Sequence, residues 1–248
     1  MKRKYIEAKT IEEAEKYAKE VLKINPYYKG LKLEIANTCN KCITELFNEF
    51  PKTKRIVKVV GNGQTINKDF KAELSKEYEK LIIMEDYNIS DKELKKEVQK
   101  RVNKLVGKNS GSAMTMKCDY RFPKNTIELI CLKYEGLYIN TRVMKDINEI
   151  NTNYQRDLEN GHAPKTDNTD YVKCIIDHEM GHILDFTYKI HKTINIEEIG
   201  KEKIEKEVSK YATNSVHEFV AECWCEYRNS RTPQPLANMV GNKIEKNK

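Results

Sequence analysis

One predicted helix constrains this chain more than any other segment. The pattern over residues 168–189 is typical of an apolar helix, preceded by a polar loop over 161–167 that supplies proline and candidate capping residues. This helix contains His178-Glu-Met-Gly-His182. Four residues are about 400° of helical rotation, so both imidazoles project from one face, one turn apart. Any fold of this chain must therefore accommodate two polar rings on an apolar helix.

The histidine pair has two interpretations. In the first, both imidazoles are hydrogen-bonded core residues. In the second, they share a tetrahedral zinc ion, and Glu179, which lies next to that face, accepts a proton from a zinc-bound water. The H-E-x-x-H motif alone does not distinguish these two interpretations, because a chance match arises in about one in a hundred chains of this composition. A third ligand would favour the zinc site, since a catalytic zinc ion needs three protein ligands and an open position for water.

The segment 211–223 supplies candidates for the third ligand. Glu218 and Glu222 are four residues apart on a helix that we predict over 214–229, among apolar neighbours. This acidic stripe is expected to be partly buried, and a buried carboxylate requires a partner such as a cation. The alternative is a solvent-facing acidic helix edge. His217 is a minor alternative ligand, because its side chain projects about 100° away from that of Glu218.

These motifs together resemble a known family. The pattern is similar to the active site of the glutamate-type zincin peptidases, and within them of the catalytic domain of anthrax toxin lethal factor and its relatives from bacterial and phage mobile elements. The resemblance covers about residues 171–227, and residues 1–50 lie outside it. The residues that carry it are His178-Glu-Met-Gly-His182, Asp185, Tyr211-Ala and, seven residues after the tyrosine, Glu218-Phe-Val-Ala-Glu222.

The resemblance implies a role for each of these side chains. His178, His182 and Glu218 are expected to bind one zinc ion per chain, with Glu179 as the general base. Tyr211 is expected to donate a hydrogen bond to the developing oxyanion. Two imidazoles and one carboxylate favour zinc, although cobalt or manganese could substitute in vitro.

By the same resemblance, Asp185 and Glu222 are expected to contact the metal ligands and hold them in place without binding the metal themselves. Asp185 lies one turn beyond His182, so its carboxylate could accept a proton from a ligand imidazole and fix its tautomer.

The expected function is that of a zinc metalloendopeptidase acting on a peptide or protein substrate. Substrates of such enzymes commonly bind in extended form along an exposed sheet edge, and we expect that edge to be the strand Leu137-Tyr138-Ile139-Asn140. The alternative is a non-catalytic scaffold or interaction protein of a phage or mobile element that keeps zinc for stability. The presence of Glu179 argues against it, because a structural site has no use for a base beside the ligands.

Charge and cysteine usage argue against other classes of protein. The chain has 45 basic and 38 acidic residues, a net charge of +7, and the two signs alternate along 92–104, as on a solvated helix face. No nucleic-acid binding is expected; a nucleic-acid-associated protein built around Cys39 and Cys42 would require strong salt-dependent binding. No second C-x-x-C completes a zinc site with these two residues, and all seven cysteines are expected to be free thiols.

The sequence also suggests a cellular location. Acidic residues follow the basic start of the chain where a signal peptide would be apolar, and no uncharged stretch reaches the length of a membrane span. A cytoplasmic protein is therefore expected, with delivery outside the cell by another route left open.

The predicted fold class is α+β and zincin-like. We expect a helical N-terminal portion over 1–50 and a catalytic domain over 51–248, with a small twisted mixed sheet, a backing helix near 92–105, the H-E-x-x-H helix and a helical C-terminal part. The predicted strands are 55–60, 113–120, 127–133 and 137–140. The predicted helices elsewhere are 11–24, 32–49, 195–209 and 214–229, with a loop and a short helix after Pro233.

Overall fold

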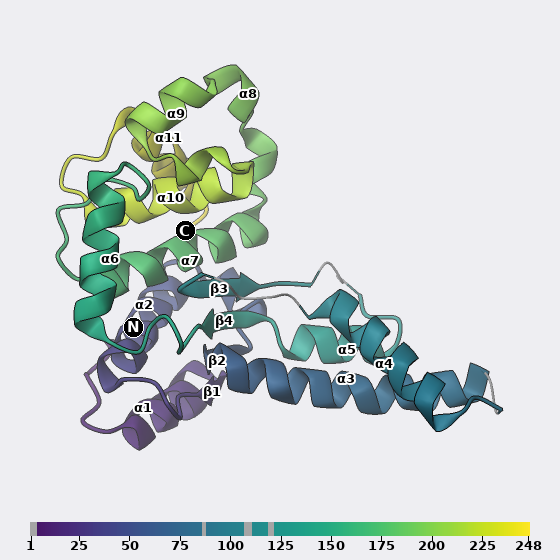
Figure 1. The fold of residues 1–248 in the computed structure, drawn as a ribbon. Helices are drawn as coiled ribbons and strands as arrows, with labels where there is room; N and C mark the ends of the chain where they lie inside the picture. The colour runs from purple at the N-terminus through teal and green to yellow at the C-terminus, as the bar shows by residue number, and fades with distance from the viewer. Residues whose placement is uncertain (1–3, 86–87, 107–110, 119–121) are drawn as a thin grey trace.

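A small mixed sheet lies at the centre of the computed structural model, which describes residues 4–85, 88–106, 111–118 and 122–248 (Figure 1). Its strands are β1 (Asn25–Tyr27), β2 (Val59–Asn62), β3 (Ala113–Met116) and β4 (Gly136–Ile139), in the spatial order β1-β2-β4-β3. The first three in that order run parallel, and β3 pairs antiparallel with β4 at the edge. The molecule therefore has the predicted mixed α+β composition.

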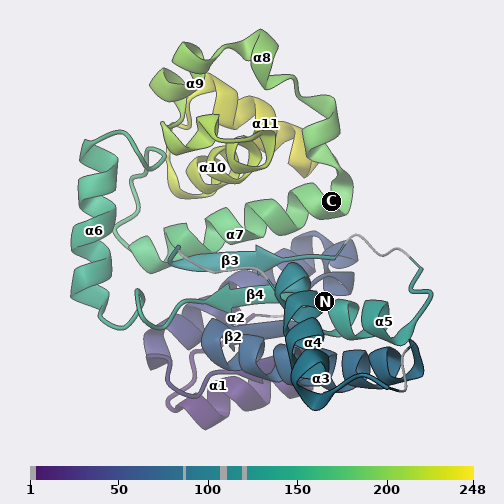
Figure 2. The same ribbon diagram turned by 45° about the vertical axis from the view of Figure 1, so that its right-hand side comes forward.

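One long helix covers the edge of the sheet formed by β3, and a second long helix packs on the first. Helix α7 (Tyr171–Tyr188) runs beside β3, and α10 (Val216–Asn229) packs on the other side of α7 (Figures 1 and 2). Gly181 permits this close packing, because a Cβ atom at position 181 would lie 2.7 Å from the Cα atom of Ala221. The glycine inside the H-E-x-x-H motif thus sets the distance between the two helices.

The remaining helices surround this centre. A second hydrophobic core fills the space between the sheet and α3, α4 and α5, where Phe70 and Tyr134 stack at 4.9 Å between ring centroids. Helices α3 and α4 extend away from the rest of the molecule as an arm (Figure 1). The helices are α1 (Ile11–Tyr17), continued by a π-helical turn (Ala18–Leu22), α2 (Leu33–Glu49), α3 (Gly63–Glu85), α4 (Asp91–Leu105), α5 (Thr126–Lys133), α6 (Ile147–Glu159), α8 (Ile196–Ile199), α9 (Lys201–Glu207) and α11 (Pro235–Glu245).

Short 3-10 turns connect several of these elements. They are η2 (Pro51–Arg55), η3 (Ile190–Thr193) and η4 (Tyr211–Thr213). None of the described helices combines the length and the apolar composition that crossing a membrane requires.

The N-terminal portion is not a separate helical unit. Its strand β1 pairs with β2, so the sheet continues across the expected boundary at residue 50. Buried side chains of α2 and α7 belong to one hydrophobic core, which also includes α1, α10 and α11. Residues 4–50 therefore help to hold the helix that carries the histidine pair.

Some predicted elements were wrong. Residues 127–133 form helix α5, not a strand: the Asn125 side chain accepts a hydrogen bond from the Glu128 amide, and Ile127 and Cys131 bury one helical face. The strand expected at 55–60 lies at 59–62, because Pro51 starts the turn η2. Helices α3 and α6 were not predicted.

Candidate metal centre

Three side chains from α7 and α10 converge on one point. The Nε2 atoms of His178 and His182 lie 3.1 Å apart. Glu218, in the first turn of α10, places its Oε2 atom 3.2 Å from His178 Nε2 and 3.4 Å from His182 Nε2. The helical spacing of the two histidines and the packing of α10 on α7 thus bring together the three predicted ligands.

A hydrogen bond joins the two ring nitrogens, but the carboxylate oxygen that faces them is not satisfied in this way. Oε2 of Glu218 is buried and forms no hydrogen bond of good geometry with any described residue, although it lies within ion-pair distance of both rings. Burial alone would raise the pKa of Glu218, but the contacts with His178 and His182 outweigh it and hold the pKa well below its usual range. An ionised carboxylate facing two ring nitrogens fits a metal cation, and the three atoms are close enough to hold one.

Glu222 fixes the orientation of His178. Its Oε1 atom lies 2.7 Å from His178 Nδ1, and an ionised carboxylate can only accept, so this ring nitrogen carries the proton. In the neutral ring of His178 the lone pair is then on Nε2, which faces His182 and Glu218. The other oxygen of Glu222 accepts a hydrogen bond of 2.6 Å from the Ser209 hydroxyl. Sequence reasoning did not identify Ser209, which no motif marks.

Glu179 lies on the side of the centre that faces the sheet. Its side chain is buried, and Oε2 lies 2.8 Å from the Thr115 hydroxyl on β3. The same hydroxyl lies 3.1 Å from the Glu179 carbonyl oxygen. Thr115 was not among the predicted site residues, because the pairing of the edge strand with α7 is a tertiary contact.

Tyr211 lies in η4, immediately before α10. Its ring centroid is 6.0 Å from that of His178 and 5.5 Å from that of His162. Burial raises the pKa of Tyr211 to about 12, with the carboxylates of Glu218, Glu222 and Glu179 adding to the shift. The phenol therefore keeps its proton at neutral pH and can donate a hydrogen bond.

A cleft in two parts surrounds the centre. One part, of about 380 Å³, extends past Glu218 toward Phe186 and His217, and the other, of about 280 Å³, extends toward α6. Both parts share the walls formed by His178, Glu179 and Tyr211. A ligand in this cleft would therefore reach the general-base candidate and the phenol together.

Asp185 does not contact a ligand imidazole as expected. Its buried carboxylate accepts hydrogen bonds from the backbone N–H of His191 at 2.7 Å, from His191 Nδ1 at 2.8 Å and from His217 Nδ1 at 2.5 Å. Nδ1 of His182 has no partner among the described residues. Three residues past His182, the helix directs Asp185 toward η3 and the start of α10, and His217 faces Asp185 rather than the three ligand candidates.

The prediction that residues 137–140 form an exposed edge strand for substrate binding was also wrong. Leu137, Tyr138 and Ile139 are fully buried in β4, and Asn140 follows directly. Strand β4 lies between β2 and β3, so both of its edges are already paired. An added peptide strand could not pair with it; the edge strand beside the centre is β3.

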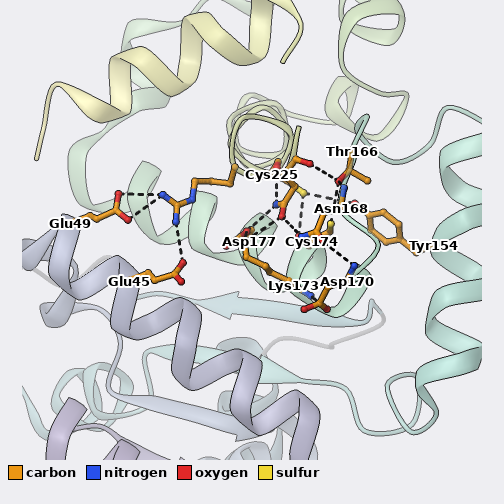
Figure 3. A network of polar contacts seen from close by, with 12 residues as sticks. Glu45, Glu49, Tyr154, Thr166, Asn168, Asp170, Lys173, Cys174, Asp177 and Cys225 are labelled. Carbon is orange, nitrogen blue, oxygen red and sulfur yellow. Dashed lines mark hydrogen bonds and ion pairs between the residues drawn. The ribbon is translucent and has the colours of Figure 1, made fainter. Parts of the chain in front are cut away.

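A polar network behind the centre holds the two ligand helices in place (Figure 3). On α7, Lys173 forms an ion pair with Asp177, and Asp177 also accepts a 2.9 Å hydrogen bond from the Asn229 amide of α10. Arg228, also on α10, pairs with Glu45 and Glu49 of α2. These contacts tie both ligand helices to each other and α10 to the N-terminal portion.

All seven cysteines lie in the described part of the chain and are thiols rather than disulfides, as predicted. Cys39 and Cys42 are buried in α2, and burial raises the pKa of Cys39 to about 12. Cys39 and Cys42 therefore belong to the core.

No known protein family, no curated protein and no solved structure matches this chain. The functional argument therefore depends on the chemistry of the site.

Proposed function

We propose that this protein is a zinc-dependent metallopeptidase that hydrolyses peptide bonds in the cleft between β3, α7 and η4. The observation that carries the proposal is the convergence of His178, His182 and Glu218 on one point, with an otherwise unsatisfied carboxylate oxygen, beside Glu179. A structural metal site would not require a second buried carboxylate, here Glu179, in the wall of a cleft beside its ligands.

His178, His182 and Glu218 would hold the zinc ion. When bound, zinc supplies Lewis-acid chemistry for hydrolysis of the peptide carbonyl. Glu222 keeps the His178 lone pair on Nε2, and Ser209 in turn holds Glu222. The arrangement of an edge strand, an H-E-x-x-H helix and a second helix with the glutamate is the one that the resemblance to glutamate-type zincins implies, and we propose a zincin-like fold on that basis.

Glu179 acts as the general base in this proposal. It removes a proton from the attacking water and returns it to the leaving amine, while the Thr115 hydroxyl holds its carboxylate toward the cleft. Tyr211 keeps its phenolic proton and donates a hydrogen bond to the oxyanion that forms on the carbonyl carbon.

The test is zinc content together with cleavage of a peptide library. Wild type is compared with Glu179→Gln, His178→Ala and, as a matched control, Glu202→Gln on the exposed surface of α9. We expect about one zinc per chain in wild type, Glu179→Gln and Glu202→Gln, and much less in His178→Ala. Only wild type and Glu202→Gln should cut, with Glu179→Gln slower by about 10²- to 10⁴-fold.

Two outcomes would contradict the proposal. Zinc bound at full occupancy without cleavage of any peptide would favour a non-catalytic zinc scaffold. Absence of zinc from wild type after purification in zinc-containing buffer would show that the three residues are not a metal site.

A further inference from the structure

The part of the cleft that extends toward α6 has the size of a pocket for one side chain. Its volume is about 280 Å³, below the range of about 300–1,000 Å³ that holds a complete small-molecule ligand. It opens beside Glu179 and Tyr211, where the proposed reaction takes place. A substrate residue next to the cleaved bond would therefore direct its side chain toward α6.

The walls of this pocket are mostly apolar. Val143, Ile150, Ala163, Pro164 and Ile175 contribute to the lining. Two contacts hold the pocket wall on one side. The Tyr154 ring stacks on Tyr171 at 4.8 Å between centroids. The Tyr154 hydroxyl lies 3.8 Å from Cys225 Sγ (Figure 3). Such walls suit the hydrocarbon part of a side chain.

One carboxylate in this pocket has no side-chain partner among the residues that the structure describes. The acidic residues of the lining are Asp157, Glu179 and Glu222, and the last two are bonded to Thr115 and to His178 with Ser209. The Asp157 carboxylate forms no hydrogen bond or ion pair with a described residue. Only the backbone carbonyl of Asp157 is used, and it accepts from the amides of His162 and Ala163.

An apolar pocket with one unpaired negative charge selects a particular kind of side chain. Lysine and arginine combine a long methylene stem, which packs on apolar walls, with a terminal cation. The cation would form a charge-assisted bond with Asp157. An apolar side chain of similar length would instead bury the Asp157 carboxylate without a partner, which costs free energy.

We infer that this α6 pocket, bounded by Ile150, Asp157, Pro164 and Ile175, binds a lysine or arginine side chain of the substrate next to the cleaved bond. The inference rests on the proposed peptidase function and assigns its substrate class: peptides with a basic residue at that position. Asp157 acts as the specificity residue and takes no part in the chemistry of hydrolysis.

The experiment compares quenched fluorescent peptides that differ at one position, which carries lysine, arginine, methionine or glutamate. Wild type should cleave the lysine and arginine peptides with a kcat/KM about 10- to 100-fold above that for methionine. Asp157→Asn should reduce this preference to about threefold or less. Asp157→Lys should favour the glutamate peptide. Glu159→Gln, which removes a charge from the exposed face of α6, is the matched control and should behave as wild type.

Binding separates this inference from the proposed function. The same peptides are titrated by fluorescence anisotropy against Glu179→Gln and against Glu179→Gln combined with Asp157→Asn, with zinc present. Tighter binding of the lysine peptide that disappears with Asp157→Asn supports the proposed pocket, even if no peptide is cut. Absence of cleavage would contradict only the peptidase proposal. Equal binding of lysine and methionine peptides, or a lysine preference that survives Asp157→Asn, would overturn the inference.

Discussion

Two neighbouring places in this protein bring together two imidazoles and one carboxylate, and they differ in how their polar atoms are satisfied. In the metal group, His178, His182 and Glu218 face one another with a carboxylate oxygen that has no good hydrogen bond. In the Asp185 group, which consists of Asp185, His191 and His217, the carboxylate accepts three N–H donors.

The difference shows that closeness of ligand-type atoms is a weak sign of a metal site. Both groups pass the same distance criterion and lie in the seam between α7 and α10. The Asp185 group is complete without an ion, because each Nδ1–H points at a carboxylate oxygen. The metal group leaves Glu218 Oε2 without a hydrogen bond of good geometry among the described residues, and a cation bound there would satisfy it. Four predictions test this contrast, from the largest expected effect to the smallest.

The first prediction separates the groups by zinc content. His182→Ala removes a proposed ligand and should lower zinc affinity by more than about 100-fold, a larger loss than the 10- to 100-fold typical of residues that only support ligands. His191→Ala removes the equivalent ring from the Asp185 group and should leave zinc affinity unchanged. Titration with a chelating indicator measures both. Equal losses in the two variants would show that the groups act as one site.

The second prediction concerns stability. Asp185→Ala leaves three N–H donors without their buried acceptor, so we expect the free energy of unfolding to fall by about 2–4 kcal/mol. The folded fraction should still bind about one zinc. Urea unfolding and metal analysis measure the two quantities. Loss of zinc at unchanged stability would place Asp185 among the ligands.

The third prediction concerns the support of the metal group. Glu222→Ala removes the acceptor of His178 Nδ1–H and frees the ring to change tautomer, so zinc affinity should fall by about 10- to 100-fold. Ser209 bonds to Glu222 and not to a ligand, so Ser209→Ala should lower zinc affinity by a smaller factor. Glu202→Ala, on the exposed surface, is the control. An unchanged affinity in Glu222→Ala would contradict the role of this hydrogen bond.

The fourth prediction uses Glu226, a buried carboxylate that also has one oxygen without a partner. No imidazole is bonded to it in the described residues, and burial raises the pKa of Glu226 to about 7 although the Gln234 amide and Lys165 oppose the shift. Below about pH 7 the protonated form of Glu226 is favoured, because it avoids burying an unpaired negative charge.

The pH dependence follows from this pKa. Between about pH 4.5 and 7 the folded protein keeps a proton that the unfolded chain has lost, so stability is highest below this window and falls as the pH rises through about 7. Glu226→Gln stays neutral and should gain about 2 kcal/mol relative to wild type at pH 8, with little gain at pH 4.5. Urea unfolding at the two pH values measures this. Equal differences at both would contradict the raised pKa.

The sequence predicted the parts of the site that depend on local geometry. The one-face arrangement of His178 and His182 follows from the helical period alone, and Glu218 follows from the same period and the apolar face around it. Partners of these residues from other elements were not predictable. Thr115 reaches Glu179 only because β3 lies beside α7, and His191 reaches Asp185 because the chain reverses at Lys189, which has φ 60°.

The errors in the predicted fold also arise from tertiary contacts and end caps that periodicity does not show. A short apolar run such as 127–133 fits a strand or a buried helix equally well, and its end cap decides. The chain places β4 between β2 and β3, although β3 precedes it in sequence, so the edge strand could not be read from strand order. Sequence periodicity defines elements, whereas neighbours in a sheet depend on tertiary packing.

The most direct test of the central claim is anomalous diffraction at the zinc absorption edge from crystals grown with zinc. The account predicts one anomalous peak per chain, within about 2.0–2.2 Å of His178 Nε2, His182 Nε2 and a Glu218 oxygen, and none at the Asp185 group. A peak between Asp185, His191 and His217 with none at the three proposed ligands would contradict it.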